Sequence, residues 1–320
     1  MDDNAAPRIG LALSGGGVRG LAHLGVLQVL EEAEIPVDMI AGTSMGGIVA
    51  GLYAAGVPIQ ELIAFSKRTG VMDVAAPDRR WRGLFGHGKM ADLLADLLGR
   101  EDVTLEELNI PVAVVSADVE TGDLVILDKG PLIPALMATS AVPIVFSPVR
   151  HQGRWLVDGG VLNNFPVDVV RRMGADRVLG VNVPPSVKFS PEDRPRARGL
   201  SPRGLRFFGN QTFDWKQPFL IAEASLGMTI QVVNRTRLEL CSPDVLLEIR
   251  LPNVGIFTSD NNADIIEAGH WVATEHLQEL IKLKTKPLPS PWRRRLRSTL
   301  RRLQRARAIL RGPESPLYPA

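Results

Sequence analysis

The sequence predicts an α/β fold in which a mainly parallel sheet is covered by helices on both faces. Short apolar runs that read as buried strands alternate along the chain with segments whose apolar residues recur at helical spacing. Glycine and proline stand at the ends of several segments, where they stop a helix or turn the chain. Hydrophobic residues make up 45% of the 320 residues and charged residues 22%, so the chain can bury a substantial core.

The individual elements follow from these patterns. Leucines recur every three residues from Leu21 to Leu30, which predicts a helix directly after the first apolar run. The predicted strands lie at 9–13, 37–41, 112–117, 124–127, 155–157, 178–183 and 245–249. The predicted helices lie at 20–33, 45–55, 220–240 and 263–283.

Charge divides the chain into two parts. The net charge is +2, but residues 282–311 hold three lysines, nine arginines and no acid. Elsewhere 25 basic residues stand against 35 acidic ones, which gives the remainder a net charge of −10. An acidic body with a cationic tail indicates an anionic partner for the tail. We therefore expect a globular domain over 8–283 and a basic tail over 284–320.

Residues 184–218 differ from the rest of the globular part. They are rich in Pro, Arg, Gly and Ser, followed by several Phe and Trp residues. One interpretation is a flexible surface insertion with a few buried anchors. The other is a lid or membrane-facing flap beside an active site.

The sequence also bears on the cellular compartment. The single cysteine, Cys241, rules out an internal disulfide framework and favours a reducing environment. The acidic N-terminus lacks the features of a secretory signal, and no apolar run reaches the length of a membrane span. We expect a cytoplasmic protein that can also bind the inner face of the membrane.

The motif Gly42-Thr43-Ser44-Met45-Gly46 stands between a predicted strand and a predicted helix. In a G-x-S-x-G turn of this kind, the serine takes strained backbone angles and presents its hydroxyl as a nucleophile. Gly42 and Gly46 allow strand and helix to approach, because a Cβ at either position would clash. A glycine-rich tight turn without catalytic function is the alternative, and we favour the nucleophile.

A second glycine-rich segment, Ser14-Gly15-Gly16-Gly17-Val18-Arg19-Gly20, joins the first strand to the first helix. Its backbone N–H groups and the helix N-terminus can hold an anion. The anion could be a nucleotide phosphate or the oxyanion of an acyl-transfer intermediate. The second strand ends without an acid for a ribose, and no G-K-[ST] follows. With Ser44 on the adjacent strand, the oxyanion is the better interpretation.

The base that would activate Ser44 is harder to identify from local pattern. None of the five histidines stands in a triad-like motif, and His23 lies among leucines as a packed structural residue. His270 and His276 lie on the last predicted helix as surface or capping groups. Asp158 follows an apolar strand and precedes two glycines, and open α/β sheets bind ligands at the carboxyl ends of strands. Taken alone, this segment favours an ordinary Asp-Gly-Gly turn.

Taken in order, these motifs resemble the patatin-like phospholipase family. The resemblance rests on SGGGVRG followed by G-x-A-H-x-G-V-L, then GTSMG, then DGG, and it covers about residues 8–282. The stretches 138–143, 163–166 and 255–260 with the residues that follow also look like that family. The resemblance implies a three-layer α/β/α sandwich and a Ser44–Asp158 dyad without histidine. It further implies an oxyanion hole from Gly15, Gly16 and Gly17, with Arg19 close by.

The implied activity is hydrolysis of carboxylic esters of phospholipids, lysophospholipids or related lipids. Ser44 would attack the ester, Asp158 would accept its proton, and water would hydrolyse the acyl-enzyme. We expect no cofactor and no metal, because no His/Asp/Glu cluster has ligand spacing. The alternatives are an esterase or thioesterase acting on soluble substrates, and a non-catalytic membrane-associated scaffold.

Within the tail, residues 288–312 have the pattern of an amphipathic helix. Ser290 can cap a helix that has Pro291 in its first turn. The apolar side would hold Trp292, Leu296, Leu300, Leu303 and Leu310, with Ile309 beside them. Packing on the acidic body and RNA binding are alternatives. We favour an anionic membrane surface and expect no nucleic-acid partner, because an ionic partner would leave the apolar stripe uncovered.

Overall fold

The structure is a computed structural model of the chain, and it describes residues 6–70, 76–77, 83–185, 216–252, 254–255 and 261–285. The strands are β1 Ile9–Leu13, β2 Met39–Thr43, β3 Ala76–Pro77, β4 Phe85–Gly86, β5 Val112–Asp118, β6 Leu124–Leu127, β7 Val149–His151, β8 Arg154–Asp158, β9 Arg177–Asn182 and β10 Val245–Glu248. The helices are η1 Gly17–Leu21, α1 Ala22–Glu32, α2 Met45–Ala54, α3 Ile59–Arg68, α5 Gly88–Leu98, η2 Leu105–Glu107, α6 Leu132–Thr139, α7 Gly160–Asn163, α8 Val167–Arg172, α9 Lys216–Leu240, α10 Asn262–Glu275 and α11 Leu277–Thr285.

The main sheet has the strand order β10-β9-β1-β2-β5-β8-β7, and β6 also pairs with β5. The five strands from β10 to β5 are parallel to one another, whereas β6, β7 and β8 pair antiparallel with their neighbours. β3 and β4 form a separate two-stranded sheet.

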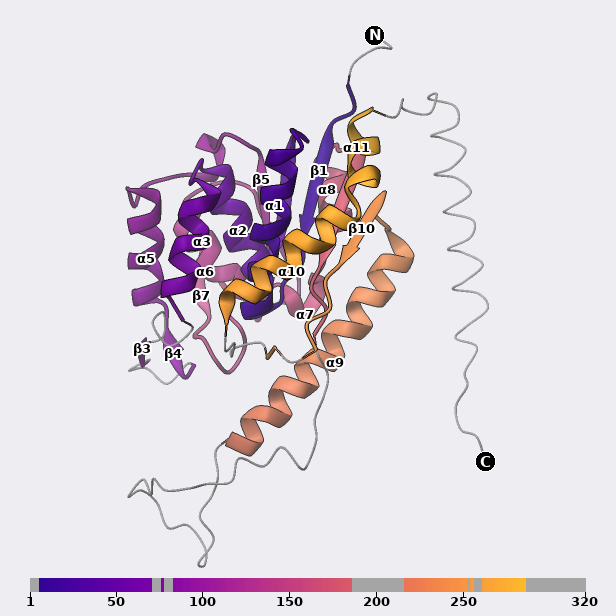
Figure 1. The fold of residues 1–320 in the computed structure, drawn as a ribbon. Helices are drawn as coiled ribbons and strands as arrows, with labels where there is room; N and C mark the ends of the chain where they lie inside the picture. The colour runs from indigo at the N-terminus through magenta and orange to yellow at the C-terminus, as the bar shows by residue number, and fades with distance from the viewer. Residues whose placement is uncertain are drawn as a thin grey trace, which may run out of the picture.

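Helices cover both faces of the sheet (Figure 1). Successive side chains of a strand point to opposite faces, and along β1 the side chains of Ile9, Leu11 and Leu13 join one core cluster while Ala12 joins the other. The first cluster includes residues of α1, α2, α6 and α10, and the second includes residues of α8. The predicted fold class, a mainly parallel α/β/α arrangement, is therefore confirmed.

The carboxyl ends of β2 and β8 meet along one edge of β5. β2 runs parallel to β5, and its last residue, Thr43, lies opposite Val115. β8 runs antiparallel to β5, and its last residue, Asp158, lies opposite Ser116. β6 pairs with the same stretches of β5 and so occupies its other edge. Two strands therefore end face to face, which brings Ser44, the residue after β2, next to Asp158.

This topology corrects one expectation from the sequence. Asp158 was expected at the carboxyl edge of a parallel sheet. Because β8 runs antiparallel to β5, the carboxyl end of β8, which carries Asp158, instead faces the carboxyl end of β2. Pairing direction depends on contacts between distant segments, and the apolar run before Asp158 carries no information about it.

Element boundaries agree with the sequence in most places, with some differences. The predicted strand 37–41 lies two residues later, at Met39–Thr43. The single helix predicted over 263–283 is wrong, because α10 and α11 are separate helices with His276 between them. Of the predicted lid, residues 186–215 lie outside the described residues, and so do residues 286–320 of the basic tail.

Candidate active site

Ser44 occupies a strained turn between β2 and α2. Its φ is 54° and its ψ is −127°, a conformation that non-glycine residues rarely adopt. A Cβ on Gly42 would lie 2.3 Å from the carbonyl oxygen of Gly46, and a Cβ on Gly46 would lie 2.5 Å from that of Leu13. Both glycines are therefore required for the close approach of strand and helix, as the sequence predicts.

Thr139 holds this turn in place from α6. The Ser44 backbone N–H donates to the Thr139 hydroxyl at 2.9 Å, and that hydroxyl donates in turn to the carbonyl oxygen of Val115 on β5. The strained residue is thus tied to the central strand. Thr139 belongs to the stretch 138–143 that resembles the family, but no local rule predicts its partner, because Thr139 and Ser44 are 95 residues apart.

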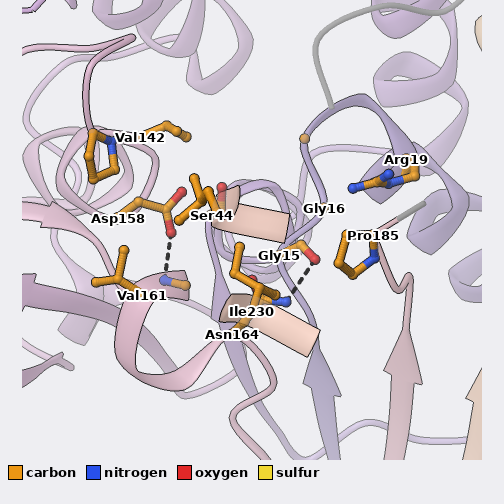
Figure 2. Close-up of a pocket in the computed structure, with 14 residues that line it drawn as sticks. Gly15, Gly16, Arg19, Ser44, Val142, Asp158, Val161, Asn164, Pro185 and Ile230 are labelled. Atoms are coloured by element: carbon orange, nitrogen blue, oxygen red, sulfur yellow. Dashed lines mark hydrogen bonds between the residues drawn. The ribbon is translucent and has the colours of Figure 1, made fainter. Parts of the chain in front are cut away.

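Asp158 is buried beside Ser44, with 6% of its surface exposed. Burial raises its pKa to about 6, against smaller opposing effects from a hydrogen bond with the Ser44 side chain and one from the Gly160 backbone N–H. The Gly160 N–H donates to Oδ1 at 2.7 Å. Figure 2 shows this bond and the carboxylate turned toward Ser44. The arrangement places a buried carboxylate with a raised pKa beside the side chain of Ser44.

The glycine-rich loop forms the opposite wall of the site. A Cβ on Gly15 would lie 2.3 Å from Asn164 Oδ1 and 3.1 Å from the Ser44 Cβ, and Gly17 has a φ of +57°. The Gly15 N–H donates to the Asn164 carbonyl oxygen at 3.0 Å. This amide is therefore already engaged, which leaves Gly16 and Gly17, both of which line the cavity, as the remaining predicted oxyanion donors.

Asn164 fixes the orientation of this loop. Its Nδ2 donates to the Gly15 carbonyl oxygen at 3.1 Å, a bond visible in Figure 2. The N–H of a trans peptide points opposite to its C=O, so a bond that holds the Gly15 carbonyl also turns the Gly16 N–H the other way. Asn164 lies in the family-like stretch 163–166. Its partner, Gly15, is 149 residues away in the sequence, so no local pattern predicts this hydrogen bond.

Arg19 and His23 differ in their relation to the cavity. Arg19 lines it, is 2% exposed, and donates from Nη1 to the Val254 carbonyl oxygen at 3.3 Å. His23 is fully buried and does not line it. Burial lowers the pKa of His23 to about 4, so the ring is neutral and donates from Nε2 to the Ser14 carbonyl oxygen at 2.8 Å. His23 therefore stabilises the glycine-rich loop through this hydrogen bond, on the side away from the cavity.

The cavity at Ser44 is small and has apolar walls. Its volume is about 40 Å³, and it brings together Gly15, Gly16, Gly17, Arg19, Ser44 and Asp158. Val142 and Pro143 contribute one wall, and Leu226 and Ile230 of α9 contribute another. The sequence did not identify these apolar residues as part of the site, because helical periodicity alone cannot show which element a helix face covers.

Two further observations concern the described part of the chain. No helix there is long and apolar enough to cross a bilayer. The same residues contain no group of three or more His, Cys, Asp or Glu side chains arranged to hold a metal ion.

Comparison with known proteins places this architecture in a family. Residues 11–171 match the family model of patatin-like phospholipases. An uncharacterized NTE family protein of Mycobacterium tuberculosis is 35% identical over 183 residues, which cover 56% of this chain and 50% of that protein. Lysophospholipase NTE1 of Mycosarcoma maydis is 31% identical over 185 residues, which cover 55% of this chain and 10% of that protein.

The chain thus spans half or less of the length of these relatives. Among solved structures, VipD from Legionella pneumophila has a similar fold, with a TM-score of 0.50, 16% identity, and coverage of 86% of this chain and 67% of that one. The matched residues include the glycine-rich loop, Ser44 and Asp158. The chain belongs to the patatin-like phospholipase family.

Proposed function

We propose that this chain hydrolyses carboxylic esters of lipids through a Ser44–Asp158 dyad. The observation that carries the proposal is the contact between a strained, buried serine and a buried carboxylate whose pKa is raised to about 6. A base whose pKa lies close to the working pH combines the correct protonation state with useful driving force for proton transfer. The patatin-like phospholipase family model and the relative named as a lysophospholipase support a lipid ester as the substrate.

In the proposed reaction, an acyl-enzyme first forms and is then hydrolysed. Asp158 takes the Ser44 hydroxyl proton as Oγ bonds to the ester carbonyl carbon, and the carbonyl oxygen becomes an oxyanion. The intermediate collapses, Asp158 returns the proton to the departing alcohol, and an acyl-enzyme remains. Water then adds to the acyl carbon, Asp158 accepts its proton, and Ser44 recovers that proton as the free acid leaves.

The oxyanion would be held by backbone amides. Gly16 and Gly17 are the donors that the glycine-rich loop offers, because the Gly15 amide bonds to Asn164. The N-terminus of α2 follows Ser44 directly and adds positive potential. Arg19 lines the same cavity and contributes a positive charge nearby. One such donor typically accounts for about a hundred- to a thousandfold in rate.

A panel of lipid classes tests the proposal. Wild type should release fatty acid from phospholipid or lysophospholipid, and Ser44→Ala and Asp158→Asn should lose this activity while remaining folded. The matched controls are Ser66→Ala and Asp118→Asn, which change a buried serine and a buried aspartate that do not line the cavity. Both controls should keep activity. Comparable rates for Asp158→Asn and wild type would contradict the dyad.

We further propose that the enzyme works at an anionic membrane surface reached through residues 288–312. The support is the amphipathic pattern of this cationic segment. A soluble esterase or thioesterase is the second candidate. Activity on vesicles compared with a monomeric ester distinguishes the two, because only the first depends on the lipid interface.

A further inference from the structure

Helix α9 covers the Ser44 cavity with one side and exposes an apolar residue on the other. Leu226 and Ile230 line the cavity. Met228 stands two residues from each of them, and at about 3.6 residues per turn its side chain points to nearly the opposite side of the helix. Met228 is 50% exposed, and Figure 1 shows α9 along the outside of the fold. The same helix therefore contacts the active site and presents an apolar surface to the outside.

This outer side of α9 carries a continuous apolar stripe. Ile221 and Val232 are 51% and 67% exposed. Together with Ser225 and Met228 they follow one another at steps of four, three and four residues, the spacing of a single helix face. We call Ile221, Ser225, Met228 and Val232 the outer face of α9. Every exposed side chain described between residues 221 and 232 is uncharged, whereas the solvent side of a helix normally carries charges.

The hydroxyl groups on and beside the outer face are already bonded within the helix. Ser225 Oγ donates to the Ile221 carbonyl oxygen at 2.7 Å, and Thr229 Oγ1 donates to the Ser225 carbonyl oxygen at 3.0 Å. A hydroxyl that is bonded internally loses little when it leaves water, because its donor stays satisfied. The outer face can therefore enter an apolar medium with both hydroxyl donors paired.

The size of the outer face distinguishes a lipid surface from a second copy of the chain. Residues 221–232 form a strip about 18 Å long and about 10 Å wide, or about 180 Å². A stable dimer buries about 800 Å² on each partner. A helix in a bilayer interface needs no matching surface and buries only its apolar side, to a depth of about 5 to 10 Å. A bilayer is therefore the occupant that this narrow strip fits.

We propose that the outer face of α9 inserts into the surface of a lipid bilayer and holds the Ser44 cavity at the interface. The cavity lies against the inner side of the same helix, so about one helix diameter, or about 10 Å, separates it from the lipid. The contact is apolar and does not require anionic lipid, in contrast to the contact proposed for the cationic tail. The choice of lipid rests on the proposed function, because a lipid ester is the substrate that the cavity would receive.

A fluorophore on the outer face tests this contact directly. In a full-length Cys241→Ser protein, Val232→Cys is labelled with the environment-sensitive dye NBD. Vesicles of dioleoyl phosphatidylcholine are zwitterionic and attract the cationic tail little. They should shift the NBD emission to shorter wavelength and raise its intensity by about twofold or more. Trp271→Cys labelled in the same way is the control, because Trp271 is 62% exposed on α10, and its emission should not change.

Added charge on the outer face provides a second measurement. The double variant Met228→Glu, Val232→Glu should bind the same vesicles roughly tenfold less tightly, because a carboxylate must lose its hydration to enter the bilayer. Hydrolysis of the vesicle lipid should fall with binding. The rate on p-nitrophenyl butyrate, a monomeric ester, should be unchanged, because neither residue lines the cavity. Trp271→Glu adds a charge elsewhere and should keep the wild-type binding.

The outcomes separate this inference from the proposed function. Hydrolysis of both esters without an NBD shift would contradict the lipid contact alone, and a shift without hydrolysis of either ester would contradict the proposed function alone. An NBD shift that depends on protein concentration and needs no vesicles would identify a second copy as the occupant and overturn the proposal. Emission that is at short wavelength from the start and insensitive to vesicles would show that the chain itself covers the outer face, which would also overturn it.

Discussion

Burial is the main cause of the raised pKa of Asp158. The carboxylate stands among apolar and backbone atoms, which disfavours its ionised form and raises its pKa to about 6. The folded protein therefore binds a proton at Asp158 more readily than the unfolded chain does. The stability that this protonation contributes is complete below pH about 4 and is lost as pH rises through about 6.

Replacement of Asp158 by asparagine should therefore stabilise the protein at neutral and alkaline pH. At pH 8 the free energy of unfolding should exceed that of wild type by on the order of 3 kcal/mol, and the difference should shrink toward pH 4. Urea denaturation across this range measures it. Asp118→Asn controls for the loss of a buried carboxylate elsewhere on the sheet. A variant that is less stable than wild type at pH 8 would contradict this explanation of the pKa.

Asn164 gives a second prediction at the residue scale. Its amide holds the Gly15 carbonyl and so orients the Gly16 N–H. Asn164→Leu should lower kcat by roughly tenfold to a hundredfold with KM nearly unchanged, because the lost interaction stabilises only the transition state. Asn163→Leu is the control, since the Asn163 side chain bonds to Asp168 and does not line the cavity. Equal losses of kcat in the two variants would point to a general structural effect.

At the scale of elements, α9 limits the size of the cavity at Ser44. The cavity of about 40 Å³ is far smaller than typical ligand pockets, which hold about 300 to 1,000 Å³. Leu226 and Ile230 of α9 form one of its walls. Entry of an acyl chain therefore requires these side chains, or the helix that carries them, to move.

Shortening one of these side chains should ease that movement. Ile230→Ala should raise kcat/KM for a decanoyl ester by roughly fivefold relative to a butyryl ester. Val232→Ala is the matched control, because Val232 is 67% exposed on the same helix. An unchanged ratio of decanoyl to butyryl rates in Ile230→Ala would show that α9 does not limit acyl-chain length.

Local patterns in the sequence were sufficient for the strands of the main sheet other than β7, for α1, α2 and α9, and for the turn at Ser44, whereas Asp158 was identified through the resemblance to the family. Strand-to-helix transitions, stop signals and glycine motifs all act over a few residues, and β1, α2 and β6 lie close to their predicted ranges. The antiparallel direction of β8 and the break between α10 and α11 depend on tertiary packing. So do the contacts of Thr139 with Ser44 and of Asn164 with Gly15, whose partners are 95 and 149 residues apart.

At the scale of the whole molecule, the charge distribution sets how the enzyme would meet its substrate. The tail over 284–320 is strongly cationic, whereas the remainder is acidic. Each arginine near an anionic bilayer contributes up to about 1 kcal/mol of binding, so several acting together can hold the protein at the surface.

A version of the protein ending at Lys286 should therefore lose binding to anionic vesicles. Flotation in low and moderate salt measures this, and the binding of the full chain should weaken as salt rises. Hydrolysis of a monomeric ester should be unchanged, because no residue of the proposed dyad or oxyanion hole lies in the tail. Equal binding by the two forms would exclude the tail as the membrane anchor.

Labelling with a fluorophosphonate tests the dyad most directly, because this reagent reacts readily with a serine that is activated as a nucleophile. The proposed mechanism predicts one adduct, located by mass spectrometry at Ser44, whose rate of formation is half-maximal near pH 6, the pKa of Asp158, and constant above it. Asp158→Asn should lower the plateau rate by about a hundredfold or more. An adduct on another serine, or an Asp158→Asn protein labelled at the wild-type rate, would contradict it.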